Sequence, residues 1–351
     1  MRKEIILITG SFGLIGFETS LFFLKKGYYV LGIDNNLRAK LFGIKTDYHR
    51  KLDYLKRNFT SFYVHFSFDI RDKKKLEKLF KDYSQKISLI IHTAAQTSHD
   101  WSAKDPYTDF SVNSTATFYL LEFYRKYCPK AVFIFTSTNK VYGDRVNFFN
   151  FKETDKRFDL KKNDKYYQGI DESFPIDQAM HSPFGVSKAS ADLMVQEWGK
   201  YFGLKTGVFR LGVVAGSGQD GAFYQGFLSY MINQIKNDEV FEIIGYRGKQ
   251  VRDILHSKDL VEAFYLYFKN PKKGEVFNLG GGRENSASVL ELIEKVCKIT
   301  KRKPKITYQD KVRLGDHKWW ITDFRKFKKD YPSWRIKYSV DDIILDIYKN
   351  S

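Results

Sequence analysis

The chain has 351 residues, of which 43% are hydrophobic and 28% charged, a balance typical of globular proteins that excludes a disordered, collagen-like or low-complexity chain. Lys and Arg number 59 against 41 Asp and Glu, which gives a formal net charge of +18 at pH 7. Such an excess can serve nucleic-acid binding, but no helix-turn-helix, zinc-finger or RRM signature accompanies it, so we expect no nucleic-acid partner.

Strands alternate with helical stretches over the first two-thirds of the chain. Residues 4–9 contain four consecutive apolar residues and predict a buried parallel strand. A helix is expected next over residues 14–25, ending at Gly27. Further strands are expected at 29–33, 63–68, 89–92, 131–136 and 206–210, and further helices at 107–127 and 184–202. Repeated strand–helix units predict an α/β fold with a parallel sheet covered on both faces.

The pattern changes after about residue 215, where shorter elements alternate with glycine-bearing loops. We expect residues 1–215 to form the first domain and residues 216–351 a smaller α/β domain, with segments of the two allowed to interleave. The first domain includes a long polar connection at 144–180, and loops of this length are usually functional or ordered by a ligand.

The first strand runs directly into Gly10-Ser11-Phe12-Gly13-Leu14-Ile15-Gly16. In this context Gly10 permits a tight turn, Gly13 lets the backbone approach a pyrophosphate, and Gly16 lets the helix pack closely on the strand. The helix N-terminus supplies free N–H groups for the phosphates. The segment, with Phe12, Leu14 and Ile15, predicts a dinucleotide site on a Rossmann-type doubly wound sheet.

Asp34 ends the second strand, where a carboxylate accepts hydrogen bonds from the adenosine ribose. It would repel the 2′-phosphate of NADP and therefore favours NAD, although Arg38 is close enough to offset that repulsion. Other cofactor contacts are expected at the ends of the second, third and fourth strands, from Asn35, Asn36, Asp69, Ile70, Thr93, Ala94, Ala95 and Gln96.

These residues resemble the extended short-chain dehydrogenase/reductase family of NAD-dependent epimerases and dehydratases. The resemblance runs essentially from end to end and rests on the glycine spacing, Asp69-Ile70-Arg71-Asp72, His92-Thr93-Ala94-Ala95, Asn113 and Val141-Tyr142-Gly143. Within the family, Ser137-Thr138-Asn139-Lys140-Val141-Tyr142-Gly143-Asp144 and Gly248-Lys249-Gln250-Val251-Arg252-Asp253 are most similar to the CDP-paratose 2-epimerases, also called CDP-tyvelose epimerases.

The resemblance implies a redox-neutral reaction on a nucleotide sugar, CDP-linked in that group. Tightly bound NAD takes a hydride from a sugar carbon, a keto sugar forms, and the hydride returns to the other face, which inverts C2. The family also implies cofactor contacts from Asn113 and Lys188. A homodimer or higher homo-oligomer is expected, formed through the helices at 107–127 and 184–202.

The catalytic helix departs from the family pattern. Family members use a Tyr-x-x-x-Lys pair on one helix face, in which the lysine lowers the pKa of the tyrosine so that the phenolate accepts the sugar hydroxyl's proton. Lys188 stands at the lysine position, but Phe184 stands at that of the tyrosine. A phenyl ring has no proton to exchange.

Three interpretations of this departure stay open. The chain is a catalytically impaired protein that binds NAD and a sugar nucleotide; or another acid/base has taken over; or the proton passes through water to Thr138, which aligns with the family's catalytic Ser or Thr. The candidates for a replacement group are Tyr166, Tyr167, His181 and Lys188 itself. The intact cofactor motif favours retained catalysis.

Substrate recognition is expected from residues around the fourth and fifth strands and in the second domain. Asn139 and Lys140 stand where the family's dehydratases carry Asp-Glu, which argues against dehydration and leaves epimerisation or another NAD-dependent oxidoreduction of a sugar nucleotide. Arg252 and Arg313 match family phosphate-binding motifs, and guanidinium groups pair bidentately with a diphosphate. His99, Asp100 and Trp101 follow the fourth strand and are expected near the sugar.

Several other site classes are not expected. The two cysteines, Cys128 and Cys297, form no CxxC pair, and the seven histidines form no HExxH or HxxxH pair, so we expect neither a disulfide framework nor a metal site. No stretch approaches the roughly 18 to 20 apolar residues of a membrane span. We therefore expect a cytoplasmic protein with no membrane partner.

Overall fold

The computed structural model describes residues 4–43, 45–218, 226–312 and 315–350. Its largest sheet has seven strands in the order β12-β8-β5-β4-β1-β2-β3, and every pairing in it is parallel. The strand order reverses between β1 and β4, the place where doubly wound sheets bind ligands. The strands of this sheet are β1 (Ile5–Thr9), β2 (Tyr29–Ile33), β3 (Tyr63–Phe66), β4 (Ile87–His92), β5 (Val132–Thr138), β8 (Lys205–Leu211) and β12 (Glu275–Leu279). The predicted fold class is confirmed.

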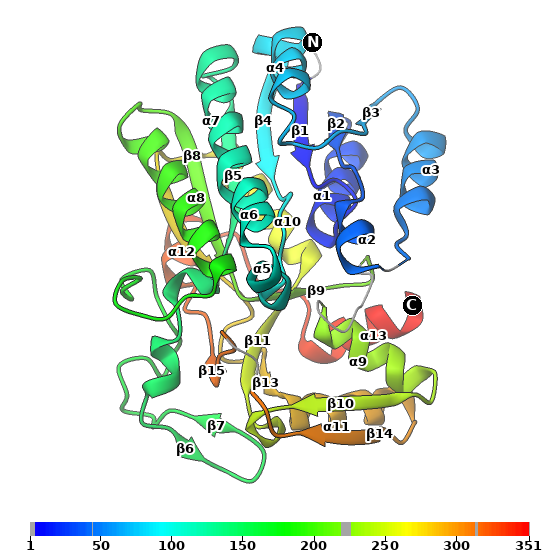
Figure 1. The fold of residues 1–351 in the computed structure, drawn as a ribbon, viewed down its shortest axis with the longest axis vertical. Helices are drawn as coiled ribbons and strands as arrows, with labels where there is room; N and C mark the ends of the chain where they lie inside the picture. The colour runs from blue at the N-terminus through cyan, green and yellow to red at the C-terminus, as the bar shows by residue number, and fades with distance from the viewer. Residues whose placement is uncertain (1–3, 44, 219–225, 313–314, 351) are drawn as a thin grey trace.

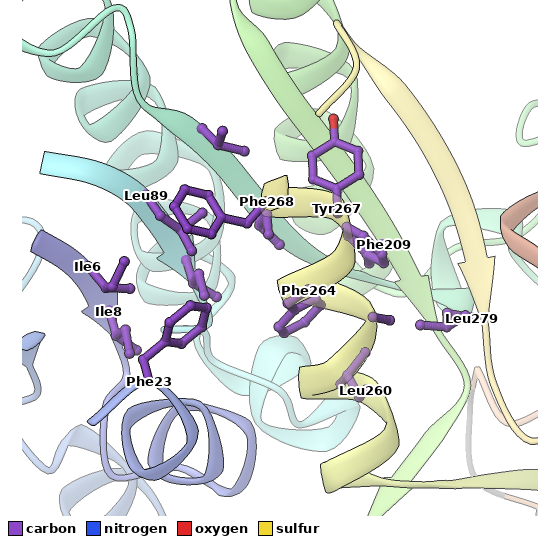
Figure 2. Packing of buried hydrophobic residues seen from close by; sticks show 14 of the residues in the cluster. Ile6, Ile8, Phe23, Leu89, Phe209, Leu260, Phe264, Tyr267, Phe268 and Leu279 are labelled. Atoms are coloured by element: carbon purple, nitrogen blue, oxygen red, sulfur yellow. The ribbon is translucent and has the colours of Figure 1, made fainter. Parts of the chain in front are cut away.

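Helices cover both faces of this sheet (Figure 1). One face carries α1 (Leu14–Lys25), α10 (Ser257–Lys269) and α12 (Arg325–Asp330), and the other carries α4 (Lys73–Tyr83), α7 (Ala116–Tyr127) and α8 (Pro183–Lys200). Figure 2 shows the first of these layers, where Ile6, Ile8 and Leu89 of the sheet lie near Phe23 of α1 and Phe264 of α10. The apolar runs of the parallel strands are therefore buried on both sides.

The helix predicted at 107–127 is interrupted. The chain forms α6 (Pro106–Phe110), then a π-helical turn η2 (Ser111–Thr115), and only then α7. A π-turn displaces the side chains that follow it by a fraction of a turn, and such turns are frequent at functional sites. Here it carries Asn113, whose side chain supports the loop after β4.

The segment 216–351 contributes to both parts of the molecule. β12 pairs with β8 and α10 packs on α1, so this segment completes the large sheet and its cover. The expected boundary at residue 215 stays a prediction, since the chain returns to the sheet after it. The smaller part contains the strands β9 (Val213–Ala215), β10 (Val240–Ile244), β11 (Val251–His256), β13 (Ser286–Ser288), β14 (Lys305–Gln309) and β15 (Trp319–Trp320), and the helices α9 (Phe227–Lys236), α11 (Val289–Thr300) and α13 (Val340–Asn350).

The polar connection at 144–180 has a small core of its own. Leu160, Ile170 and Phe174 are buried against Trp319 and Ile321, and Ile170 forms a bridge with Thr322. The short elements outside the layers are α2 (Leu37–Phe42), α3 (Tyr48–Asn58), α5 (His99–Lys104), β6 (Lys152–Glu153), β7 (Phe158–Asp159) and the 3₁₀ turns η1 (Ser84–Lys86), η3 (Asn139–Tyr142), η4 (Arg145–Phe148) and η5 (Tyr246–Gly248).

Two findings on the described residues concern membranes and metals. No helix among them combines the length and apolar character that crossing a bilayer requires. They also hold no group of three or more His, Cys, Asp or Glu side chains placed to bind a metal ion.

We expect Phe264→Ala to lower the free energy of unfolding by about 3–5 kcal/mol, because it leaves a cavity between α10 and the sheet. Urea unfolding followed by circular dichroism measures the change. Phe148→Ala is the matched control; its side chain is 78% exposed, and we expect a change within about 0.5 kcal/mol. A loss below about 1 kcal/mol for Phe264→Ala would contradict the role of α10 in this core.

Candidate active site

A cavity of about 520 Å³ opens where β1, β4 and β5 end. The glycine-rich turn after β1, the loop after β4 and the last residues of β5 line it, together with the first turn of α8. The turn between β8 and β9 and the start of α9 close its far wall. The cavity therefore lies at the carboxyl ends of the parallel strands, at the point where their order reverses.

The glycine-rich turn is shaped for a close backbone approach. Gly10 has a φ of +68°, and a Cβ at Gly16 would lie 2.0 Å from the carbonyl oxygen of Gly10. The cap residue of α1 is Gly13, which has no side chain to occupy the first N–H groups of the helix. These free N–H groups and the open cradle fit a pyrophosphate.

Asp34 shapes the adenosine end of the cavity. Its Oδ2 accepts a hydrogen bond from the Phe12 N–H at 2.9 Å and its Oδ1 accepts one from the Asn36 N–H at 2.8 Å. Burial raises the pKa of this carboxyl group. A carboxylate has lone pairs beyond those two bonds, so the group can still accept hydrogen bonds from a ribose diol. Arg38 also lines this end.

Most of the predicted cofactor residues lie on the wall of this one cavity. They are Gly10, Phe12, Gly13, Leu14, Ile15, Gly16, Asp34, Asn36, Arg38, Asp69, Ile70, Thr93, Ala94, Ala95, Gln96 and Lys188. Asp69 is fixed there by Arg71; although burial opposes it, the bonds from Arg71 hold the pKa of Asp69 below its usual value.

Two predicted cofactor residues lie behind the wall instead. Asn35 turns to Asp69, with Nδ2 donating to Oδ2 at 3.0 Å. Asn113 holds the loop after β4, because its Oδ1 accepts from the Gln96 N–H at 2.9 Å and its Nδ2 donates to the Gln96 carbonyl at 3.0 Å. The structure therefore makes both residues supports of the cavity rather than parts of its surface.

Further lining residues were not indicated by the sequence. Leu37, Leu41, Thr46 and Tyr48 come from the helical insertion between β2 and β3, and the stretch 211–215 comes from the chain leaving β8. The position of the insertion directly after Asp34 is the one signal in the sequence for the first set. The second set is recognisable only once β8 is known to lie beside β5.

At the other end of the cavity, three predicted catalytic positions come together: Thr138, Phe184 and Lys188 all line it. Phe184 lies in the first turn of α8, and its ring is 5.1 Å from that of His99. Lys188 follows one turn later and donates from Nζ to the Thr136 carbonyl at 2.7 Å. Burial lowers the pKa of Lys188 to about 7. Thr138 Oγ1 accepts from the Lys140 N–H at 3.2 Å.

Three candidate replacement groups lie elsewhere. Tyr166 stacks on Phe149 at 5.3 Å inside the core of the connection. Tyr167 packs under the guanidinium group of Arg283 at 3.6 Å. His181 places its ring nitrogens against two backbone carbonyls, Ala179 at 2.9 Å and Val141 at 2.8 Å. None of the three lines the cavity, because the connection packs Tyr166 and Tyr167 beside Trp319 of the smaller part and backbone carbonyls hold His181.

The predicted substrate residues also lie partly on the cavity wall and partly away from it. His99 and Lys140 line the cavity, whereas Asp100, Trp101, Asn139 and Arg252 do not. Arg252 is engaged behind the wall, in an ion pair with Asp316 and in a hydrogen bond to the Val251 carbonyl at 2.7 Å. Arg313 lies outside the described residues.

His99 and Lys140 are both held in fixed positions. His99 Nδ1 lies 2.6 Å from Ser182 Oγ, and burial lowers the pKa of His99 to about 3, so the ring is neutral at pH 7. Lys140 donates from Nζ to the Gly315 carbonyl at 2.9 Å. Burial lowers the pKa of Lys140 to about 7.

This chain is similar to known proteins along most of its length. The profile of the NAD dependent epimerase/dehydratase family matches residues 6–280. The CDP-paratose 2-epimerase of Salmonella typhi is 33% identical over 353 residues, which cover 98% of each chain. The UDP-glucose 4-epimerase of Thermotoga maritima, solved with UDP-glucose, is 26% identical with a TM-score of 0.78, covering 99% of this chain and 98% of that one. The UDP-glucose 4-epimerase of Thermus thermophilus, solved with NAD, has the same fold, with a TM-score of 0.78 at 23% identity over 99% of this chain and 98% of that one.

We expect Asp34→Ala to weaken NAD binding by about 10- to 100-fold, because hydrogen bonds to a charged group contribute about 1.5–3 kcal/mol. NADP binding should weaken less, since the repulsion of its 2′-phosphate is also removed. Calorimetric titration of cofactor-free protein measures both affinities. Asp82→Ala, which removes an exposed carboxylate paired with Lys78 on α4, should bind NAD like the original protein. Unchanged affinity in Asp34→Ala would show that the ribose is held elsewhere.

Proposed function

The chain belongs to the NAD-dependent epimerase/dehydratase family, whose members act on sugar nucleotides, and on this premise we propose that it inverts C2 of a CDP-linked sugar. NAD is the cofactor, and when bound it takes up a hydride from the sugar carbon and returns it. The observation that carries the proposal is the likeness to a CDP-paratose 2-epimerase along 98% of both chains.

The chemistry of the cavity supports epimerisation over dehydration. Asp34 and Asp69 are the carboxylates among its described lining residues, and both lie at the adenosine end. Elimination of water needs both an acid and a base beside the sugar. At the two positions where dehydratases carry that pair, this chain has an amide, Asn139, which can serve as neither, and a single amine, Lys140.

Each proposed contact follows from the position of a side chain. The Thr138 hydroxyl, at the end of β5, binds the reacting sugar oxygen. Lys188, one turn into α8, holds the cofactor ribose. His99 and Lys140 bound the space for the sugar, because both line the cavity near Phe184. Arg252 stays a candidate for the diphosphate, reached if it leaves its ion pair with Asp316.

Phe184 favours a second candidate function. Without a hydroxyl at this position, a protein that binds NAD and a sugar nucleotide without turnover would have the same cavity. A further NAD-dependent oxidoreductase of sugar nucleotides differs from an epimerase by releasing NADH in each cycle.

A deuterium label at C2 of a CDP-hexose separates these candidates. We expect NMR to show the C2 epimer with the label still at C2 and no net rise in NADH absorbance, because hydride leaves and returns within one site. UDP- and dTDP-hexoses serve as comparison substrates. Inversion at C4, loss of water or accumulation of NADH would contradict C2 epimerisation. Turnover that appears only in Phe184→Tyr would favour the binding protein.

We also propose that the outer faces of α7 and α8 join two copies of the chain. Phe118, 41% exposed, packs edge-on against Trp198, which in turn contacts Phe202, also 41% exposed. Leu193 adds a further half-exposed apolar side chain on α8. Light scattering should give twice the chain mass, and Leu193→Glu should give monomers; a monomeric original protein would contradict the proposal.

A further inference from the structure

Phe184 stands where the family has its proton-accepting tyrosine, so another group must take the proton. A sugar hydroxyl must lose its proton when its carbon is oxidised. Seven described lining residues have an ionisable side chain: Asp34, Arg38, Tyr48, Asp69, His99, Lys140 and Lys188. The first four belong to the adenosine end, around the glycine-rich turn and the chain that follows β2 and β3. Three groups therefore remain beside Phe184.

His99 is a weak proton acceptor. Burial lowers its pKa to about 3, and the positive charges of Lys140 in its protonated form and of Arg252 act in the same direction against the opposing effect of Asp316. Its Nδ1 is occupied by Ser182 Oγ at 2.6 Å. A ring that stays neutral down to such low pH does not hold a proton taken from a sugar hydroxyl.

The contacts of Lys188 hold its side chain on the cofactor side of the cavity. Its Nζ donates to the Thr136 carbonyl and lies 4.1 Å from the centre of the Phe135 ring. The carboxylates of Asp192 and Asp109 favour its charged form, although burial outweighs them. This is the position at which we have proposed a contact to the ribose.

Lys140 is the remaining amine, and its surroundings favour its neutral form. It belongs to the turn η3 directly after Thr138, its backbone N–H bonds Thr138 Oγ1, and its carbonyl faces Gly185 in the first turn of α8. Its Nζ donates to the Gly315 carbonyl at 2.9 Å, and the ionisable groups around it are Asp316, Arg252, His99 and His317. Arg252 pairs with Asp316, and both histidines are neutral because burial lowers their pKa values. No second carboxylate among the described residues near it compensates an ammonium charge at Lys140.

We propose that Lys140 is the general acid/base that replaces the missing tyrosine hydroxyl, an inference that rests on the proposed epimerase function. The hydroxyl O–H bond breaks and an N–H bond forms on Nζ, while the oxygen electron pair forms the C=O bond and hydride leaves the same carbon for NAD. On the return of hydride to the opposite face, Nζ gives the proton back to the oxygen. Neither proton nor electron is gained or lost over the cycle.

Two substitutions distinguish a proton carrier from a fixed charge. Lys140→Met removes the amine, and Lys140→Arg keeps a cation that does not deprotonate. Both should lose about 100-fold or more in kcat and retain bound NAD, read from the absorbance of the denatured protein. Lys162→Met, at an exposed lysine of the connection, should behave like the original protein. If Lys140→Arg keeps kcat within about threefold, the side chain acts as a charge and the proposal fails.

A second substitution that restores kcat, and the pH dependence of kcat, test the same assignment without relying on loss of activity alone. Phe184→Tyr placed in Lys140→Met should regain at least about tenfold in kcat, because it restores a hydroxyl one turn before Lys188. In the original protein, kcat should fall as pH drops through about 7, where the amine becomes protonated. Failure of the rescue together with an unchanged pH profile in Lys140→Met would overturn the proposal.

Direct titration separates a failure of this assignment from a failure of the proposed function. The rate at which acetic anhydride modifies Lys140 in NAD-loaded protein, followed by mass spectrometry with Lys162 as reference, reports the fraction of free amine. A free amine at neutral pH supports the assignment even if no tested sugar is epimerised. An amine that stays protonated above pH 9 overturns it, whatever substrate the protein takes.

Discussion

The buried ion pair between Arg210 of β8 and Asp192 of α8 fixes the geometry of the cavity end that Thr138, Phe184 and Lys188 line. The guanidinium group donates to Asp192 Oδ1 at 2.9 Å and also to the Tyr142 hydroxyl at 2.9 Å. Ser137 of β5 donates to the other Asp192 oxygen, Oδ2. One network thus joins β5, β8, α8 and the turn η3, and breaking a buried pair typically costs about 3–5 kcal/mol. Because Phe184 and Lys188 share α8 with Asp192, their distance from Thr138 follows from this network.

A second polar network holds α8 through Ser187, against Asp109 and Asn113. Asp109 accepts hydrogen bonds from Ser187 of α8 and from the Gln96 side chain, and Asn113 donates to both Asp109 and Ser187. Burial raises the pKa of Asp109, which these bonds counteract. The loop after β4 and α8 are consequently positioned by one cluster, so the two cavity walls that they form keep a fixed relation to each other.

Local chain patterns predicted most of the residues that line one half of the cavity and left the other half open. Gly10, Gly16 and Asp34 act through the turn and strand end in which they stand, so their spacing was enough to place them. The role of Lys140 depends on Arg252 and Asp316, which reach it from distant parts of the chain. Tyr166 and His181 had suitable chemistry, but their direction is set by packing of the connection against Trp319 and by backbone carbonyls. The helical pattern over residues 107–127 did not predict the π-turn that contains Asn113.

The position of β12 at the edge of the sheet has a consequence for the growing chain. β8 ends at Leu211, and its outer edge is paired by β12, which begins at Glu275. A ribosome adds about 5–20 residues per second, so the edge of β8 stays open for several seconds after the strand itself has been made. An open edge of a buried strand is a template for pairing with another chain. During translation the open edge of β8 in this interval exposes the unfinished chain to aggregation and to chaperones, whereas in the finished fold β12 covers that edge.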